Sequence, residues 1–349
     1  TTVLNTLWQS QVPPFYRRLS FNYKTYTQLM KVRFFLLASA LLATATGIAA
    51  QKVEPIKYGD FENWITRNIK ESGIIGGKTK QVYAIGPTAT INGDKPYTNA
   101  GGSPWASSNI MAKVVGITKT SNAVFPEQRS AGNRCCKMST ILENCKAMGL
   151  INIDVVVPGS IFLGYMKEPI TSTSDPYSKM EMGIPFTRRP KALVFDYKIY
   201  VPEGGTRLYS SGFGKKKTLP GSDFAEAYII LQQRSEDADG NISARRVGTG
   251  RERFGSSTAG WKNGHRLKVN YGDISDRPDY KAWMGLLNGD RAYYARNSKG
   301  KMVPVEETEW ADADATPTHM LVMFSSGCGE AYVGTVGMSI SVDNIGLEF

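Results

Sequence analysis

Histidine is scarce in this chain, with only His265 and His319 among 349 residues. This excludes a histidine-rich metal site, and a Ser–His–Asp catalytic site would have to use one of these two side chains. We place His265 in a surface turn and His319 at the start of a strand. The sequence also has no Cys-x-x-Cys pair, which argues against structural zinc. Internal repeats and low-complexity linkers are absent too.

Strong positive charge is also missing from most of the chain. Lys and Arg number 42 against 31 Asp and Glu, for a formal net charge of +11. Five of the basic residues lie in the first 50 residues, which contain no acidic residue, so the remainder carries +6. No segment combines dense Lys and Arg with interleaved aromatic residues, as nucleic-acid-binding segments do. We therefore expect no nucleic-acid partner.

Residues 30–50 have the three parts of a secretory signal peptide. Lys31 and Arg33 follow Met30, an uncharged run begins at Phe34, and small residues end the segment. This order of charge, apolar run and small side chains is typical of an export signal. The apolar run is too short and too rich in Ala and Thr for a permanent span, and no Cys follows it that could carry a lipid. We expect an exported protein (periplasmic, outer-surface or secreted) whose mature chain has no stable membrane span.

The signal also sets the expected domain boundaries. An export signal lies at the N-terminus, so residues 1–29 are interpreted as an extension upstream of the natural start at Met30. Residues 51–349 are then expected to form a single domain. The polar stretches at 171–178 and 236–243 are interpreted as long loops within it.

The four cysteines allow two interpretations. Cys135, Cys136, Cys145 and Cys328 are an even number, which permits disulfides in an oxidising compartment. Adjacent cysteines rarely bridge each other because the geometry is strained, so the simplest bridge joins Cys135 or Cys136 to Cys145. Several buried free thiols are an equal alternative.

Short segments rich in Val and Ile, separated by Gly, Pro or Asn, predict strands along residues 80–349. Only 279–295 has a helical pattern, and its internal glycines weaken it. Many short strands without alternating helices favour an all-β antiparallel sandwich. The predicted strands are 80–86, 109–117, 136–142, 152–157, 160–166, 191–201, 226–233, 265–271, 318–324 and 339–349.

Several segments resemble one family, both in their amino-acid sequences and in their order along the chain. They are GDFENW (59–64), SPWASSN (103–109), GIPFTRRPKALVFDYKIYVP (183–202), AEAYIIL (225–231) and the ending from Phe324 to Phe349. The chain is similar here to the Putative carbohydrate metabolism domain family of exported Bacteroidetes proteins, from roughly Tyr58 to the C-terminus. The resemblance implies a jelly-roll β-sandwich of the galactose-binding or carbohydrate-binding-module kind. It also implies a role connected with polysaccharides.

In sandwiches of this resemblance the first and last strands lie side by side, which would bring Asp60 or Glu62 near Asp343. Carboxylates converging there could hold a structural Ca²⁺, which takes six to eight oxygen ligands. The alternative is that Glu62 and Asp343 cap turns and accept backbone hydrogen bonds.

Strand alternation locates a candidate binding site. In 191–201 it places Leu193 and Phe195 in the core and Asp196 and Lys198 on the opposite face. In 225–233 it places Ala227 and Ile229 in the core and Glu226 and Tyr228 opposite. If both strands share a sheet, the four polar residues share a face on which carboxylates and an aromatic ring could bind sugar. The alternative is a solvated face with cross-strand ion pairs. Arg188 and Arg189 could close the rim of this site.

Trp105 lies in a Gly/Ser/Pro loop before a strand and is a candidate aromatic platform for sugar.

Three functional classes remain open. A glycan-binding module needs only a polar groove with aromatic rings. A glycoside hydrolase needs two carboxyl groups at a defined separation, for which Asp196 and Glu226 are the candidate pair. An envelope scaffold or adhesin would instead bind a protein. The resemblance favours an oligo- or polysaccharide ligand, and the lack of a clear acid–base pair favours binding over hydrolysis.

The signal peptide predicts a defined mature N-terminus. N-terminal sequencing of the natural protein is expected to begin near Gln51, because cleavage follows the small residues Ala49 or Ala50. Recovery of peptides from residues 1–29 would contradict both the start at Met30 and the cleavage.

Overall fold

A computed structural model describes residues 52–97, 102–147, 151–212, 214–328 and 330–349. In these residues all regular structure is β-strand or short 3₁₀ helix, which confirms the all-β class. Segment 279–295 contains only the 3₁₀ turns η3 (Ala282–Met284) and η4 (Gly289–Arg291) before its strand. No helix in the described part of the chain is long and apolar enough to cross a membrane. The predicted extension and signal peptide lie outside the described residues.

The strand order is that of a jelly roll. One antiparallel sheet has the order β21-β15-β27-β9-β8, and the other contains β20-β19-β25-β12-β5. Two four-stranded sheets therefore make up the sandwich, β9-β27-β15-β21 and β12-β25-β19-β20. Their strands follow one another along the chain in the order β9, β12, β15, β19, β20, β21, β25 and β27. This confirms the predicted jelly-roll β-sandwich. The bounds are β5 (Trp105–Ser107), β8 (Val124–Ser130), β9 (Asn133–Ser139), β12 (Ser160–Met166), β15 (Ala192–Tyr200), β19 (Ala225–Glu236), β20 (Ile242–Phe254), β21 (Lys262–Lys268), β25 (His319–Ser325) and β27 (Ser339–Glu348).

The core between the two sheets follows the predicted alternation. Leu193 and Phe195 of β15 are fully buried, as are Ala227 and Ile229 of β19. Phe195 meets Phe324 of β25 edge to face, with ring centroids 4.8 Å apart, so the two sheets are in direct contact.

Strand β1 (Val53–Pro55) pairs antiparallel with the last strand, with Val53 opposite Glu348. The first and last described strands are therefore neighbours, as expected. The segment 59–62, expected to supply the first strand, is a turn instead, with Tyr58 and Phe61 at positive φ. Phe61 is nevertheless a core residue.

Three sequence assignments were wrong in detail. Segment 109–117 is broken by a turn with positive φ at Val115 and Gly116, giving β6 (Ile110–Val114) and β7 (Ile117–Ser121). Segment 136–142 divides into β9 and β10 (Ile141–Ala147), and β10 pairs with β11 (Ile151–Val157). His265 lies within β21 opposite Phe195, not in a turn, whereas His319 does begin β25.

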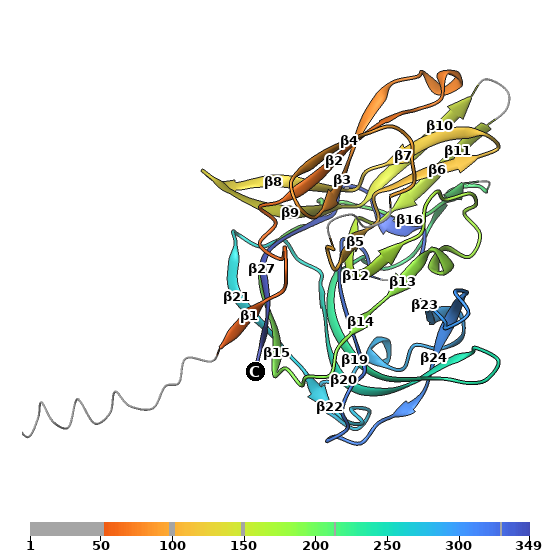
Figure 1. Ribbon diagram of the computed structural model, residues 1–349. Helices are drawn as coiled ribbons and strands as arrows, with labels where there is room; N and C mark the ends of the chain where they lie inside the picture. The colour runs from red at the N-terminus through yellow and green to blue at the C-terminus, as the bar shows by residue number, and fades with distance from the viewer. Residues whose placement is uncertain (1–51, 98–101, 148–150, 213, 329) are drawn as a thin grey trace, which may run out of the picture. The chain divides into compact units, whose positions relative to one another are not determined.

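The second sheet continues into a closed ring. Strand β20 pairs with β24 (Met302–Trp310), then β23 (Tyr293–Arg296) and β13 (Met180–Met182) follow, and β13 pairs with β12. Because β12 also pairs with β25, seven strands close on themselves. In Figure 1, β15 and β21 stand on the left, β23 and β24 on the right, and β19 and β20 between them. The face of β19 turned away from the sandwich core is therefore the inside of this ring.

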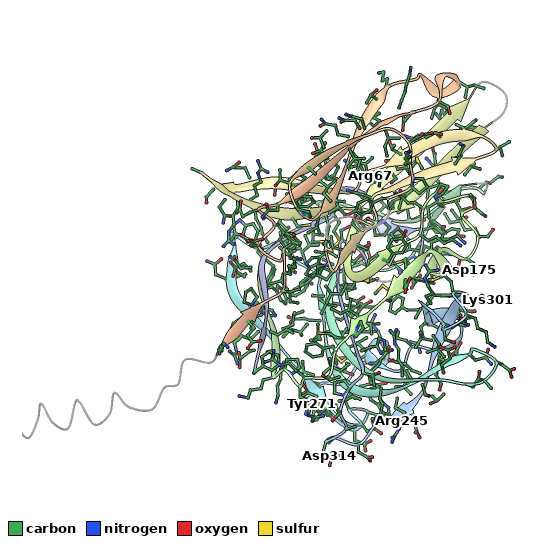
Figure 2. The ribbon with its side chains drawn as sticks, viewed as in Figure 1. Arg67, Asp175, Arg245, Tyr271, Lys301 and Asp314 are labelled. Atoms are coloured by element: carbon green, nitrogen blue, oxygen red, sulfur yellow. The ribbon has the colours of Figure 1, made fainter. Side chains whose placement is uncertain are left out.

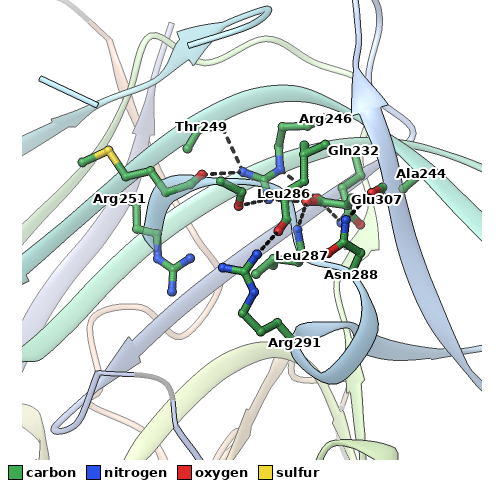
Figure 3. A network of polar contacts seen from close by, with 12 residues as sticks. Gln232, Ala244, Arg246, Thr249, Arg251, Leu286, Leu287, Asn288, Arg291 and Glu307 are labelled. Atoms are coloured by element: carbon green, nitrogen blue, oxygen red, sulfur yellow. Dashed lines mark hydrogen bonds and ion pairs between the residues drawn. The ribbon is translucent and has the colours of Figure 1, made fainter. Parts of the chain in front are cut away.

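A buried ion pair lies inside the ring. Arg246 and Glu307 are ion-paired, and both side chains are fully buried. Arg246 Nε donates to Glu307 Oε1 at 2.7 Å, and Gln232 Nε2 donates to the same oxygen at 2.6 Å. The Leu287 N–H donates to Glu307 Oε2 at 2.6 Å (Figure 3). Each oxygen of this carboxylate thus has a donor, as a buried charge requires.

Smaller sheets lie beyond the sandwich. They are β3-β2-β4, β6-β7, β10-β11-β17 and β18-β16-β26. Arg67 of β2, labelled in Figure 2, makes a bidentate, buried ion pair with Glu168 at 2.9 and 2.6 Å. The remaining bounds are β2 (Trp64–Lys70), β3 (Thr79–Ile85), β4 (Ala89–Asn92), β14 (Ile184–Pro185), β16 (Arg207–Tyr209), β17 (Ser211–Gly212), β18 (Lys217–Thr218), β22 (Asn270–Tyr271), β26 (Val333–Thr335), η1 (Gly73–Ile75) and η2 (Pro176–Lys179).

All four cysteines are buried free thiols. Burial raises the pKa of Cys135 to about 12, and burial also raises the pKa of Cys136. Of the two sequence interpretations, the structure has the free thiols.

Removal of residues 341–349 is expected to unfold the whole domain. These residues form most of β27, which lies between β9 and β15 and buries Val342, Ile345 and Leu347 in the core. Circular dichroism should show loss of the cooperative melting transition. A truncated protein that melts like the parent would contradict this placement.

Glu307→Ala is expected to lower the free energy of unfolding by about 3–5 kcal/mol, because Arg246 is left as an uncompensated buried charge. The control is Glu309→Ala on the same strand, whose side chain is 61% exposed and pairs with Arg245. It should cost less than about 1 kcal/mol. Urea denaturation of both variants measures the difference, and equal losses would contradict a structural role for the buried pair.

Candidate functional site

The candidate residues on the two strands are not brought together. Asp196 and Lys198 lie on β15 in one sheet, whereas Glu226 and Tyr228 lie on β19 in the other. The condition that these strands share a sheet is not met, because the jelly-roll winding places β15 in one sheet and β19 and β20 in the other. Asp196 and Glu226 therefore do not form a carboxyl pair on one face.

Glu226 and Tyr228 are inside the ring, each with only 1–2% of its surface exposed. Arg251 Nε and Arg253 Nε each lie 2.9 Å from Glu226 Oε1. Burial opposes the charge of Arg251, but the carboxylate of Glu226 outweighs it and raises the pKa of Arg251 above its usual value. Tyr228 donates to the Met323 sulfur at 3.0 Å. Both residues are thus packed into the interior and do not form an open binding face.

Asp196 belongs to a charge cluster on the other sheet. Arg129 Nη1 lies 2.7 Å from Asp196 Oδ2 and 2.5 Å from Asp343 Oδ2, and its guanidinium stacks over Trp261. Burial alone would raise the pKa of Asp196, but hydrogen bonds from Asn344, the Gly264 N–H and Arg129 lower it. Burial raises the pKa of Asp343 despite Arg129. The cluster joins β8, β15 and β27, while Lys198 is simply exposed.

The residues considered for calcium have protein partners. Asp343 binds Arg129, and Glu62 Oε1 accepts a hydrogen bond from the Arg134 N–H at 2.9 Å. Within the described ranges, no group of three or more His, Cys, Asp or Glu side chains could hold a metal ion. Asp343 also accepts a hydrogen bond from the Asn344 N–H at 2.8 Å, so both carboxylates accept backbone hydrogen bonds, as the alternative interpretation expects. Calcium binding at Glu62 and Asp343 stays a prediction.

Trp105 and Arg189 have structural contacts. Trp105 is 1% exposed in the main core, and its Nε1 donates to Lys57 O at 2.9 Å. Trp105 is the first residue of β5, not part of the loop before it, and its side chain packs in the core. Arg189 donates to the carbonyls of Ala313 and Ala315 and stacks over Tyr271. Neither residue lies in a groove with Glu226.

A cavity of about 280 Å³ provides a different candidate site. Four ring strands contribute to its lining, including Met323 and Ser325 of β25 and Tyr293 of β23. Ser325 is the direct cross-strand neighbour of Glu226, so the buried carboxylate lies one strand away from the cavity lining. The hairpins β6–β7 and β10–β11 supply the rest of the wall, together with η2 and the segment before β26.

Three tyrosine rings line this cavity: Tyr177, Tyr293 and Tyr332. Tyr177 and Tyr293 meet edge to face with centroids 5.8 Å apart. Tyr332 donates its hydroxyl to Thr173 O at 2.7 Å. Since these contacts fix the rings, aromatic surface is presented without further ordering of the side chains.

Polar groups surround the rings. Hydroxyl side chains in the lining include Ser160, Ser172 and Ser325. Two carboxylates also line the cavity, and each is paired with a cation: Glu143 with Lys119 at 3.4 Å and Glu330 with Arg207 at 3.2 Å. A pocket of this kind, largely apolar with a few placed polar groups, is the usual form of a small-molecule site.

Sequence reasoning missed this cavity because its residues come from loops and hairpins far apart in the chain. Thr173 and Tyr177 lie in the polar stretch 171–178, which was identified only as a long loop. Loops often carry function, so an aromatic residue within that loop was the available signal. Glu330 and Tyr332 lie in the C-terminal segment that was used only for the family resemblance.

Comparisons with solved structures give distant likenesses. A putative glycoside hydrolase from Bacteroides thetaiotaomicron is 15% identical with a TM-score of 0.41, over 78% of this chain and 81% of that one. A putative glycoside hydrolase from Bacteroides vulgatus is 13% identical with a TM-score of 0.37, over 85% and 95%. A carbohydrate-binding module specific for non-crystalline cellulose is 10% identical with a TM-score of 0.25, over 72% and 92%.

No curated protein matches the chain significantly. Residues 61–280, well over half of the sequence, match the family described as Putative carbohydrate metabolism domain. This agrees with the resemblance carried by the sequence motifs, and the chain belongs to the Putative carbohydrate metabolism domain family.

Proposed function

We propose that this protein is an exported glycan-binding β-sandwich and that the cavity beside the ring is its binding site. The observation that carries the proposal is the set of three fixed tyrosine rings, Tyr177, Tyr293 and Tyr332, in a cavity of about 280 Å³. Membership of a carbohydrate metabolism family supports a saccharide as the ligand.

The chemistry of the lining suits a sugar. The C–H face of a pyranose packs on an aromatic ring, while its hydroxyls need hydrogen-bond partners. Tyr177 and Tyr332 supply ring surface, and serine hydroxyls with the Glu143 and Glu330 carboxylates supply donors and acceptors. Because the rings are held by internal contacts, binding orders few side chains and loses little affinity to that cost.

The partners and positions of the carboxylates favour binding over hydrolysis. Hydrolysis requires one carboxyl group to deliver a proton to the leaving oxygen. Glu226 is ion-paired with two guanidinium groups and Asp196 with Arg129, and neither carboxylate lines the cavity. Glu143 and Glu330 do line the cavity, and they are therefore the pair that a hydrolase would have to use.

Export is part of the proposal. It is supported by the charged, apolar and small-residue order of residues 30–50. A protein placed outside the cytoplasm meets polysaccharides directly.

Tyr177→Ala is expected to weaken binding to the glycan identified on an array by about tenfold, because an aromatic contact with the sugar is lost. The control is Tyr200→Ala, since Tyr200 is 55% exposed on β15 in the other sheet, and it should leave the affinity unchanged. Isothermal titration calorimetry measures both. Equal affinities of the two variants would place the site elsewhere.

Reducing-sugar release on the same glycan tests the hydrolase alternative. We expect no release by the parent protein. Release that is lost in Glu143→Gln or Glu330→Gln would instead establish catalysis at the cavity. An array without any bound glycan, together with capture of a protein partner, would favour the scaffold or adhesin.

A further inference from the structure

We propose that the cavity accepts a saccharide that carries an alkyl or acyl chain, with the chain held between the hairpins β6–β7 and β10–β11. This inference rests on the proposed glycan-binding function and narrows its ligand class. It follows from the difference between the two sets of elements that line the cavity.

The two hairpins present aliphatic faces to the cavity. In β6–β7, Val114 lies opposite Ile117 and Ala112 opposite Lys119, and all four line it. In β10–β11, Cys145 lies opposite Ile153, and both line it. Among the lining residues of β11, Ile153, Val155 and Val157 are consecutive members of one strand face. Each hairpin thus contributes several neighbouring aliphatic side chains, beside the charged Lys119 of β7 and Glu143 of β10.

These aliphatic side chains are only partly covered by protein. Val114, Ile153, Val155 and Val157 are half-buried, not fully buried like the core of the sandwich. A contiguous apolar face left in this state is characteristic of a binding surface. The hollow of about 280 Å³ is larger than the roughly 150 Å³ apolar cavity that binds benzene, so it has room for a short hydrocarbon chain.

A bare sugar would be a poor match for this wall. Each hydroxyl turned toward Ile153 or Val155 would lose its water without gaining a hydrogen bond. The three tyrosines belong to other elements, namely η2, β23 and the segment before β26, and the hydroxyls of Ser160, Ser172 and Ser325 belong to β12, the segment before η2 and β25. Of the hairpins, only β7 adds hydroxyl side chains to the lining, those of Thr120 and Ser121. The ligand is therefore expected to be amphipathic, with its sugar at the tyrosines and its chain at the hairpins.

An ion pair fixes the hairpins relative to one another. Lys119 of β7 lies 3.4 Å from Glu143 Oε2 of β10 and 3.1 Å from Glu71 Oε1. Lys119 and Glu143 both line the cavity, so the two aliphatic faces are joined by this contact across it. The hollow between them is thus held open by the fold itself.

Calorimetry with methyl, butyl and hexyl β-glucoside tests the inference. If the chain enters the hollow, affinity should rise by about fourfold for each methylene that is buried. The rise should disappear in Val155→Trp, which fills the hollow, and persist in Lys198→Trp, which adds the same side chain on the exposed face of β15. Equal affinities along the series, or a rise that survives Val155→Trp, would overturn it.

A second measurement covers the case in which Val155→Trp does not fold. Cys145 is the only cysteine among the cavity-lining residues, and it is 8% exposed. Hexyl glucoside, but not methyl glucoside, should slow alkylation of Cys145 by N-ethylmaleimide in the parent protein, measured by peptide mass spectrometry. Equal alkylation rates with the two glucosides would count against the inference.

Failure of this inference can be told apart from failure of the proposed function. If the array shows bound glycans but the glucoside series gives no gain, the sugar site stands and the chain site is lost. If 1-hexanol binds as tightly as hexyl glucoside and the array shows nothing, the apolar hollow stands and the glycan function is lost.

Discussion

Strand β19 is buried on both of its faces from Ala225 to Gln232, and this constraint governs the rest of the structure. One face packs into the core between the two jelly-roll sheets, and the other lies inside a ring closed by β24, β23, β13 and β12. A strand so placed has no solvent face on which to leave polar side chains. Its polar residues therefore need partners within the protein.

Buried contacts between arginine and carboxylate side chains supply these partners. Glu226 is matched by Arg251 and Arg253, and Glu307 by Arg246. Such pairs add little net stability compared with apolar packing, but removing one partner is costly. They link β19, β20 and β24, and they give Glu226, a catalytic candidate in the sequence, partners within the protein.

Closure of the ring also explains why the candidate site lies outside the ring interior. The inner face of the second sheet is filled by Tyr228, Ile230 and their neighbours, so it does not offer an open groove. The hollow lies at its border instead, where hairpins outside the sandwich meet η2 and β25. In the proposed function, fixed tyrosine rings and aliphatic hairpin side chains combine to suit an amphipathic saccharide. The sandwich would then be the scaffold, and the connecting segments would carry the recognition.

The sequence by itself determined the all-β class, the core phase of β15 and β19, and the family, because alternation and local motifs are written in consecutive residues. It did not identify β20, because a segment rich in arginine does not have the pattern of a buried strand. Only the structure places Glu226 and Glu307 on the neighbouring strands, where they pair with these arginines. Which strands share a sheet was decided only by the jelly-roll winding, and this separated Asp196 from Glu226. The cavity was likewise beyond local pattern, because Tyr293 and Tyr332 contact Tyr177 and Thr173, respectively, across more than a hundred residues of sequence.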